Sequence, residues 1–381
     1  MIVQRFLAWA PTAMPDLRAE AAGALARVYL YSDLIPGERE RAAAALTLLL
    51  EDRCLDVRQN IAEAFASHPA APRHIVLALA HDAPDIAMPV LQRSPVLNDQ
   101  DLIEILATRG EEVQAAIACR PDLSAALAAA IGEIAGPRAC VVLLQNAEAK
   151  FTPGVFARLT QRYGNDHEIR SILLNRNDLP ISERQILLLR LAHSLGRVAE
   201  REFQIGKERV RQLTEDAAQR ATLMLAGEEA HNVPGLVSHL RTSEQLTTGL
   251  VLKALLRGDL GFVRSAFAEL TGMELHRVER FLEEPERAGF RALYRSAGFP
   301  EPYLTVFQAG LASWYDSDRR DLSIAAGRKQ AAERALQAAE NHPRELGQAI
   351  NLLSRIATEA ARYEARERLQ AYAEPLRLAA A

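Results

Sequence analysis

Two arginines and one aspartate are the polar residues of this sequence whose types and spacing could form a binding site. Arg257 and Asp259 follow one apolar segment, and Arg295 holds the equivalent place in a similar segment 38 residues later. Two guanidinium groups that converge could bind an anion or clamp carboxylates. The interpretation we favour is that these arginines form salt bridges to Asp259 and to the ends of neighbouring helices.

Basic residues between positions 182 and 220 suggest a second kind of chemistry. Lys207, Arg209 and Arg211 stand where phosphate or base contacts would be made, in a segment that resembles the last helix-turn-helix of sigma-type transcription factors. The segment departs from that motif by one extra residue, and it carries eight basic and six acidic side chains. Because Glu–Arg pairs on a solvated helix explain the same residues, we favour that structural interpretation.

A third segment, residues 268–284, also has the spacing of a DNA-binding bihelical turn. Ala268, Gly272 and Val278 provide the alanine, the turn glycine and the valine of that motif. The second helix would present four glutamates beside its basic residues, which opposes binding to phosphate. We therefore interpret Gly272 as a tight turn within a helical hairpin, where glycine permits close packing or a positive φ.

Histidines and aspartates near residue 80 could suggest a metal site. His74 and His81 are seven residues apart, nearly on one helix face, and Asp82 and Asp85 follow them. Metal binding requires convergent ligands, whereas Asp85 holds the same repeat position as Asp56 and is expected to cap a helix. The sequence therefore predicts no metal site here.

The three cysteines and the absence of known motifs bear on enzymatic activity. Cys54, Cys119 and Cys140 lie far apart with no CxxC pair, so neither a disulfide framework nor a thiolate metal cage is expected. Cys119 and Cys140 lie in apolar helical runs and are predicted to be small core residues, while Cys54 lies in a turn. No P-loop, GxGxxG, HExxH or GxSxG motif occurs. We predict no enzymatic activity, no catalytic residues and no cofactor.

An internal repeat predicts the elements that position these residues. An apolar residue after a polar turn recurs at intervals of 29, 27, 26 and 30 residues, at Val57, Ile86, Val113, Ala139 and Ile169. Each interval has room for two short helices, and prolines mark several helix boundaries. A hairpin this small cannot cover its own apolar faces, so neighbouring hairpins must stack. The sequence predicts an all-α, HEAT-like alpha-solenoid of short helical hairpins followed by a C-terminal helical unit.

The pattern changes along the chain and divides it into four predicted parts. These are HEAT-like repeats at 1–182, longer connecting helices at 183–235, a compact helical-hairpin unit at 236–320 and an amphipathic helical tail at 321–381. In the third part, Gly258 and Gly298 stand where left-handed helix C-caps are expected. Residues 1–10 are too short for a secretory signal and are predicted to dock as an amphipathic segment.

Longer stretches of the chain resemble a bacterial protein family known as domain of unknown function 2336. The run LTTGLVLKALLRGDLGF and its continuation to residue 311 is similar to the C-terminal signature of that family. The segment PVLQRSPVLNDQDLIEIL, residues 89–106, is similar to its N-terminal repeats, so the likeness spans roughly residues 40–320. The resemblance implies a helical-repeat fold but no catalytic residues, because the family has no established activity.

Composition and fold class together lead to the functional expectation. The net charge is only −4, from 45 basic and 49 acidic residues, and no apolar run approaches the roughly 18 residues that cross a bilayer. We predict a cytoplasmic protein-binding or scaffold protein without membrane insertion, and a homodimer through the C-terminal helices is possible. The alternatives are a DNA-associated regulator that uses residues 182–220 or 268–284, and an enzyme with a site in the solenoid groove.

Overall fold

The structure is a computed structural model, and it describes residues 8–203, 206–316, 323–341 and 343–379. Every regular element within these ranges is a helix, and they contain no strand, which confirms the predicted all-helical class. The chain divides into two compact units, which we call unit 1 (Met1–Arg190) and unit 2 (Leu191–Ala381). Most of the predicted N-terminal docking segment, residues 1–7, lies outside the described residues.

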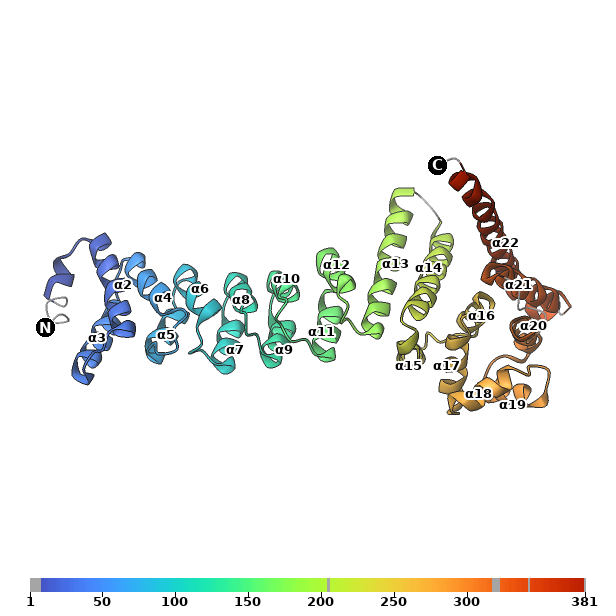
Figure 1. Ribbon diagram of the computed structural model, residues 1–381, viewed down its shortest axis with the longest axis horizontal. Coiled ribbons are helices and arrows are strands. Elements are labelled where there is room, and N and C mark those ends of the chain that lie inside the picture. The colour runs from blue at the N-terminus through green and yellow to red at the C-terminus, as the bar shows by residue number, and fades with distance from the viewer. Residues whose placement is uncertain (1–7, 204–205, 317–322, 342, 380–381) are drawn as a thin grey trace. The chain divides into compact units, whose positions relative to one another are not determined.

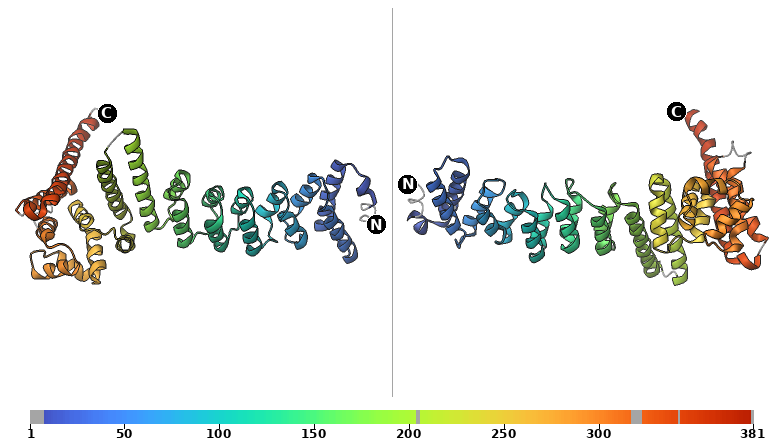
Figure 2. Two further views of the ribbon diagram at one scale, coloured as in Figure 1. Left: turned by 180° about the vertical axis from the view of Figure 1, so that it is seen from behind. Right: turned by 90° about the horizontal axis from the view of Figure 1, so that it is seen from below.

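The helices of unit 1 are short and form two rows. In order they are η1 (Ala10–Thr12), α2 (Pro15–Tyr31), α3 (Pro36–Leu49), α4 (Leu55–Phe65), α5 (Arg73–Ala80), α6 (Pro84–Arg93), α7 (Asp99–Thr108), α8 (Glu111–Ala118), α9 (Ala125–Ile134), α10 (Pro137–Gln145), α11 (Pro153–Tyr163) and α12 (His167–Asn175). The even-numbered helices from α2 to α12 follow one another in one row, and the odd-numbered helices lie in the other (Figure 1). The same rows are visible from behind (Figure 2, left).

The repeated apolar positions found in the sequence are the core contacts of the even-numbered row. Each is the third residue of its helix, and each is at most 2% exposed: Val57, Ile86, Val113, Ala139 and Ile169. Burial of a branched or aliphatic side chain at this place in every repeat joins each helix to its neighbours in the row. The other helix of each pair is present as α3, α5, α7, α9 and α11.

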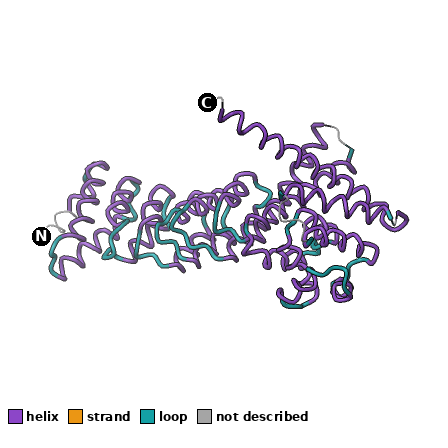
Figure 3. The backbone as a smooth tube through the Cα atoms, turned by 45° about the vertical axis from the view of Figure 1, so that its right-hand side comes forward, coloured by secondary structure: helices purple, strands orange, loops and turns teal. Residues whose placement is uncertain are grey.

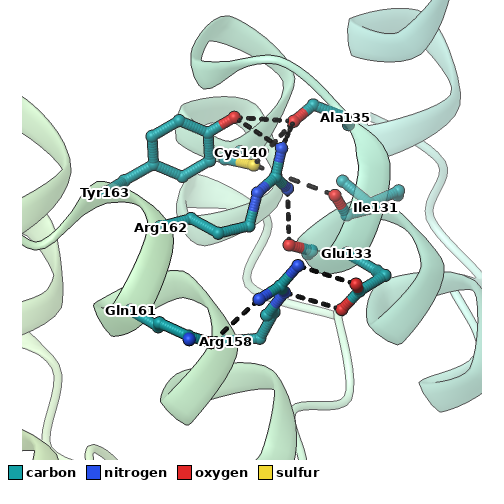
Figure 4. A network of polar contacts seen from close by, with 9 residues as sticks. Ile131, Glu133, Ala135, Cys140, Arg158, Gln161, Arg162 and Tyr163 are labelled. Carbon is teal, nitrogen blue, oxygen red and sulfur yellow. Dashed lines mark hydrogen bonds and ion pairs between the residues drawn. The ribbon is translucent and has the colours of Figure 1, made fainter.

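Arginine side chains fasten successive helix pairs of unit 1 by bonding to backbone carbonyl groups. Arg120, which is 9% exposed, donates hydrogen bonds to the carbonyl oxygens of Leu91 at 2.5 Å and Ser94 at 2.7 Å. Arg162 in α11 donates in the same way to Gly132 at 2.7 Å and Ala135 at 2.9 Å, at the end of α9 (Figure 4). The last carbonyl groups of a helix have no partner within it, so these arginines replace missing hydrogen bonds.

Unit 2 contains longer helices and a compact aromatic core. After α13 (Ile181–Phe203), which begins in unit 1, come α14 (Lys207–Glu228), η2 (Ala230–Asn232), α15 (Val233–Thr242), α16 (Thr248–Arg257), α17 (Leu260–Thr271), α18 (Leu275–Leu282), α19 (Ala288–Ser296), η3 (Glu301–Tyr303), α20 (Leu304–Tyr315), α21 (Ile324–Glu340) and α22 (Pro343–Ala379). Figure 3 shows these helices connected by short loops. The last two lie in the part of the chain predicted to form the tail.

Glycine and aromatic residues organise the centre of unit 2. Gly258 and Gly298 have φ of +83° and +76°, which confirms the predicted left-handed caps after α16 and α19. The ring of Phe267 contacts the rings of Phe290, Phe299 and Phe307, at centroid distances between 5.2 and 6.3 Å. These rings come from α17, α19, α20 and the loop before η3, so they join the second half of the predicted hairpin unit into one core.

Candidate functional site

The structure separates the three polar residues that the sequence suggested as a set. Arg257 ends α16 and Asp259 precedes α17, with their Nε and Oδ2 atoms 3.5 Å apart. Arg295 instead pairs with Glu301, with distances of 2.6 and 3.2 Å to its two carboxylate oxygens. Within the described residues, the two arginines therefore hold different carboxylates, which is the arrangement of a structural salt bridge at each helix end.

Asp259 lines a cleft of about 370 Å³ within unit 2. The polar lining includes His231, Arg264 and Ser265, and the glycines Gly227 and Gly261 also contribute to the walls. Burial raises the pKa of Asp259, although the positive charges of two nearby arginines oppose the shift. The Oδ2 atom is buried and accepts no hydrogen bond from a described residue, and its ion-pair partner is the Nε atom of Arg257.

Few charged side chains line this cleft. Arg264 forms an ion pair with Glu279, so its charge is already balanced. Among the described lining residues, Asp259 is the one acidic side chain, which leaves no pair of carboxylates for acid–base catalysis. Ser265 also lines the cleft. A nucleophilic serine needs a base in contact with its hydroxyl, and no hydrogen bond between Ser265 and a described base is present.

The basic segment that raised the alternative of nucleic-acid binding lies on a helical hairpin. Arg211 pairs on its own helix with Glu208 at 2.7 Å and Glu215 at 3.4 Å, while Lys207 and Arg209 are exposed. The Glu208 pairing raises the pKa of Arg211, since it favours the charged guanidinium. These are the Glu–Arg pairs of a solvated helix.

The geometry of the α13–α14 hairpin differs from that of a DNA-binding turn. The helix α13 continues through Gly196. A Cβ atom at Gly196 would lie 2.4 Å from the Thr214 hydroxyl of α14, so this glycine permits close helix approach. Because both residues lie about two turns from the connection, the helices run side by side, whereas helix-turn-helix motifs cross at about 90–120°.

The segment 268–284 does form a bihelical turn. Gly272 has φ of +68° between α17 and α18, as predicted, and Val278 is fully buried. The exposed side of α18 carries acidic and basic residues together, and His276 lies 3.2 Å from Glu274. The turn is therefore a packed hairpin whose surface has mixed charge.

The predicted roles of Asp85 and Cys119 are wrong. Asp85 is the second residue of α6, and the cap position is Ala83, which has no side-chain hydrogen bond. An acidic residue in the first turn still favours the helix through its dipole, so the charge has a structural purpose without capping. Cys119 is exposed at the end of α8 because the helix turns it away from the core, whereas Cys140 is buried as predicted.

The remaining metal and cysteine candidates are engaged in structural contacts. His74 lies 3.0 Å from the Thr47 hydroxyl, and Asp82 pairs with Arg58 at 3.2 Å. Within the described ranges, no group of three or more His, Cys, Asp or Glu residues could hold a metal ion. Burial raises the pKa of the Cys140 thiol to about 11, and its sulfur approaches backbone carbonyls of α9 and the residue after it (Figure 4). A thiol with this pKa is a poor nucleophile at neutral pH.

Sequence reasoning missed a row of charged residues in unit 1. The second residue of each even-numbered helix from α4 to α12 is exposed and charged, and in four of the five it is acidic: Asp56, Asp85, Glu112, Arg138 and Glu168. None of these four carboxylates forms an ion pair with another described residue. The sequence does contain this pattern, because each of the four acidic residues directly precedes one of the repeated apolar residues. We call the four carboxylates the acidic row.

Comparison with known proteins identifies the family. No described helix is long and apolar enough to span a bilayer. Searches against curated proteins and solved structures find no match. The family model described as an uncharacterised protein conserved in bacteria, DUF2336, matches residues 86–345, which is about two thirds of the chain and includes helices of both units. The chain therefore belongs to the family of domain of unknown function 2336.

Proposed function

We propose that this protein is a non-enzymatic, HEAT-like helical-repeat scaffold of the cytoplasm that binds a protein partner along the even-numbered row of unit 1. The observation that carries the proposal is the acidic row, which repeats an exposed carboxylate on successive helices. A solenoid of this kind offers an extended surface because each repeat contacts mainly its neighbours. The partner would present basic side chains at matching intervals.

The charges of unit 1 support a protein partner over nucleic acid. Its arginines are largely held by backbone carbonyls or carboxylates, such as Arg120 and Arg162 in the interior contacts. The acidic row leaves negative charge on the exposed edge, which repels a phosphate backbone. A basic protein segment would gain attraction from the same carboxylates, chiefly in its rate of association.

The scattered positions of the perturbed groups among the described residues support a binding role over an enzymatic one. The cleft beside Asp259 has one acidic side chain, and burial raises the pKa of the Cys140 thiol, away from reactivity. Perturbed groups at catalytic sites usually lie together and have complementary roles. In this chain, Asp259 and Cys140 lie in separate structural contacts.

The experiment is affinity capture of the tagged full-length protein from its native cytosol, with nuclease-treated and high-salt samples in parallel. A binding variant, Asp85→Lys/Glu112→Lys, reverses two charges of the acidic row. The matched control, Glu51→Lys/Glu104→Lys, makes the same change in net charge at exposed positions outside the row. We expect a stoichiometric protein that survives nuclease, is weakened about tenfold or more by the first variant and is unaffected by the second.

Other outcomes would redirect the proposal. Enrichment lost with nuclease would favour the α13–α14 hairpin and its exposed Lys207 and Arg209 as a nucleic-acid contact. A partner retained equally by both variants would remove the acidic row as the binding surface. Capture of no recurrent protein would contradict the scaffold role and turn attention to a small ligand of the cleft.

A further inference from the structure

The first helix of the even-numbered row has an apolar outer face. One side of α2 packs on α4, and its Ala22 and Ala26 are fully buried. On other sides Met14, Leu17 and Tyr31 are 68%, 51% and 72% exposed. The helix α2 therefore carries exposed apolar side chains away from its contact with α4.

This exposure is peculiar to the beginning of unit 1. Among described residues 56–190, Ile134 is the one large apolar side chain that is strongly exposed, at 42%. The shorter stretch of described residues 8–55 also exposes Ile35, Leu48 and Leu55, at 65%, 64% and 52%. An apolar surface concentrated at one end indicates an interaction site, since scattered single residues would need no explanation.

The apolar residues of α2 follow the spacing of a helix–helix interface. They alternate in steps of three and four residues: Met14, Leu17, Ala21, Ala24, Val28 and Tyr31. This seven-residue period places them in one stripe that faces a partner helix. All six are exposed or partly exposed.

The stripe is complementary to itself when a second α2 runs in the opposite direction. Antiparallel pairing about the middle of the helix sets Ala21 opposite Ala24 of the second copy, so the helices approach closely at the centre. Towards each end, Leu17 meets Val28 and Met14 meets Tyr31, pairing larger side chains with one another. A self-complementary patch of this kind produces a closed twofold dimer.

Two charges beside the stripe favour the same pairing. Glu20 and Arg27 are exposed, seven residues apart on one edge, and neither forms an ion pair with a described residue. Antiparallel pairing brings Glu20 of each copy near Arg27 of the other, which forms two equivalent ion pairs. A parallel arrangement would lack this match, since like charges would lie at equal heights.

We infer that two copies of this chain associate through their α2 helices, packed antiparallel along the stripe from Met14 to Tyr31. At 17 residues the helix is about 25 Å long, so the interface lies near the lower limit for a specific complex. The dimer is therefore reversible. It joins the scaffold at the end of unit 1 and leaves the acidic row open.

The test is sedimentation velocity of the full-length chain over a wide concentration range, with circular dichroism to verify folding. We expect a concentration-dependent dimer that Leu17→Glu weakens about tenfold or more. Glu20→Arg and Arg27→Glu should each weaken it, whereas the double variant Glu20→Arg/Arg27→Glu should restore it. The controls Ile134→Glu and Tyr363→Glu change exposed apolar residues elsewhere and should leave the dimer intact.

Three results would overturn the inference. A chain that remains monomeric at every concentration would leave another protein as the occupant of this face. A dimer insensitive to Leu17→Glu but lost in Tyr363→Glu would assign association to the C-terminal helices. Failure of the double charge variant to restore a dimer weakened by both single variants would exclude the antiparallel pairing.

Discussion

Units 1 and 2 are both entirely helical in their described residues, yet different interactions hold them together. In unit 1, polar side chains join successive helix pairs through backbone carbonyls, as Arg120 and Arg162 do. In unit 2, rings from four segments meet around Phe267, and most arginines pair with carboxylates, as Arg295 does with Glu301. A repeated contact can be extended by adding repeats, whereas a central aromatic cluster fixes one compact body.

This difference explains why the two units suit different roles. We expect each helix pair of unit 1 to be stabilised mainly by its neighbours, so that its exposed surface can vary without loss of the fold. Unit 2 depends on glycines at single positions, such as Gly258, whose added Cβ would lie 2.5 Å from the Trp314 ring. We therefore expect substitutions to act locally in unit 1 and across the whole body in unit 2.

The largest effect should come from the aromatic cluster. Phe267→Ala removes a fully buried ring that contacts three others and should lower the free energy of unfolding by about 3–5 kcal/mol. Urea unfolding followed by circular dichroism measures the loss. Tyr363→Ala, at an exposed ring on α22, is the matched control and should change little. A small effect of Phe267→Ala would mean that the cluster does not hold unit 2 together.

A somewhat smaller loss should follow removal of an arginine that joins helix pairs. Arg120→Ala leaves the buried carbonyls of Leu91 and Ser94 without donors and should cost about 2–4 kcal/mol. Arg211→Ala removes an exposed pair within one helix and should cost at most about 0.5 kcal/mol. Equal losses in urea unfolding would refute the idea that carbonyl contacts distinguish unit 1.

The left-handed glycines of unit 2 provide a third comparison. Alanine at either Gly258 or Gly272 must adopt a positive φ, which costs about 1–2 kcal/mol. At Gly258 the new methyl group also meets the Trp314 ring, whereas at Gly272 it meets open space. Thermal unfolding should therefore show the greater destabilisation for Gly258→Ala. The reverse order would indicate that Trp314 does not restrict this turn.

The smallest effect should depend on pH. Hydrogen bonding from Arg18 holds the pKa of Asp52 below its ordinary value of 3.8. The carboxylate therefore stabilises the fold above the unfolded-state pKa, and this contribution is lost as the pH falls through the folded-state pKa. The melting temperatures of wild type and Asp52→Asn should differ at pH 7 and converge in acid. A constant difference would contradict the assignment.

The sequence predicted most of the fold because its signals were local. The repeated apolar residues, such as Val57 and Ile86, and the cap glycines Gly258 and Gly298 each depend on a few neighbouring positions. The site was harder to predict, since it depends on contacts distant in sequence. Arg295 forms an ion pair with Glu301, which lies beyond the turn that follows α19. The periodicity of a sequence does not show which carboxylate an arginine will pair with.

Photo-crosslinking would test the proposed binding surface most directly. A photoreactive residue is placed at Gln59 or Gln145 of the even-numbered row, or at Glu104 or Ala129 of the odd-numbered row, all of them exposed. The full-length variants are irradiated in native cytosol and the products identified by mass spectrometry. We expect one recurrent protein adduct from the first pair and little from the second. Adducts from the odd-numbered row alone would contradict the proposal that the even-numbered row binds the partner.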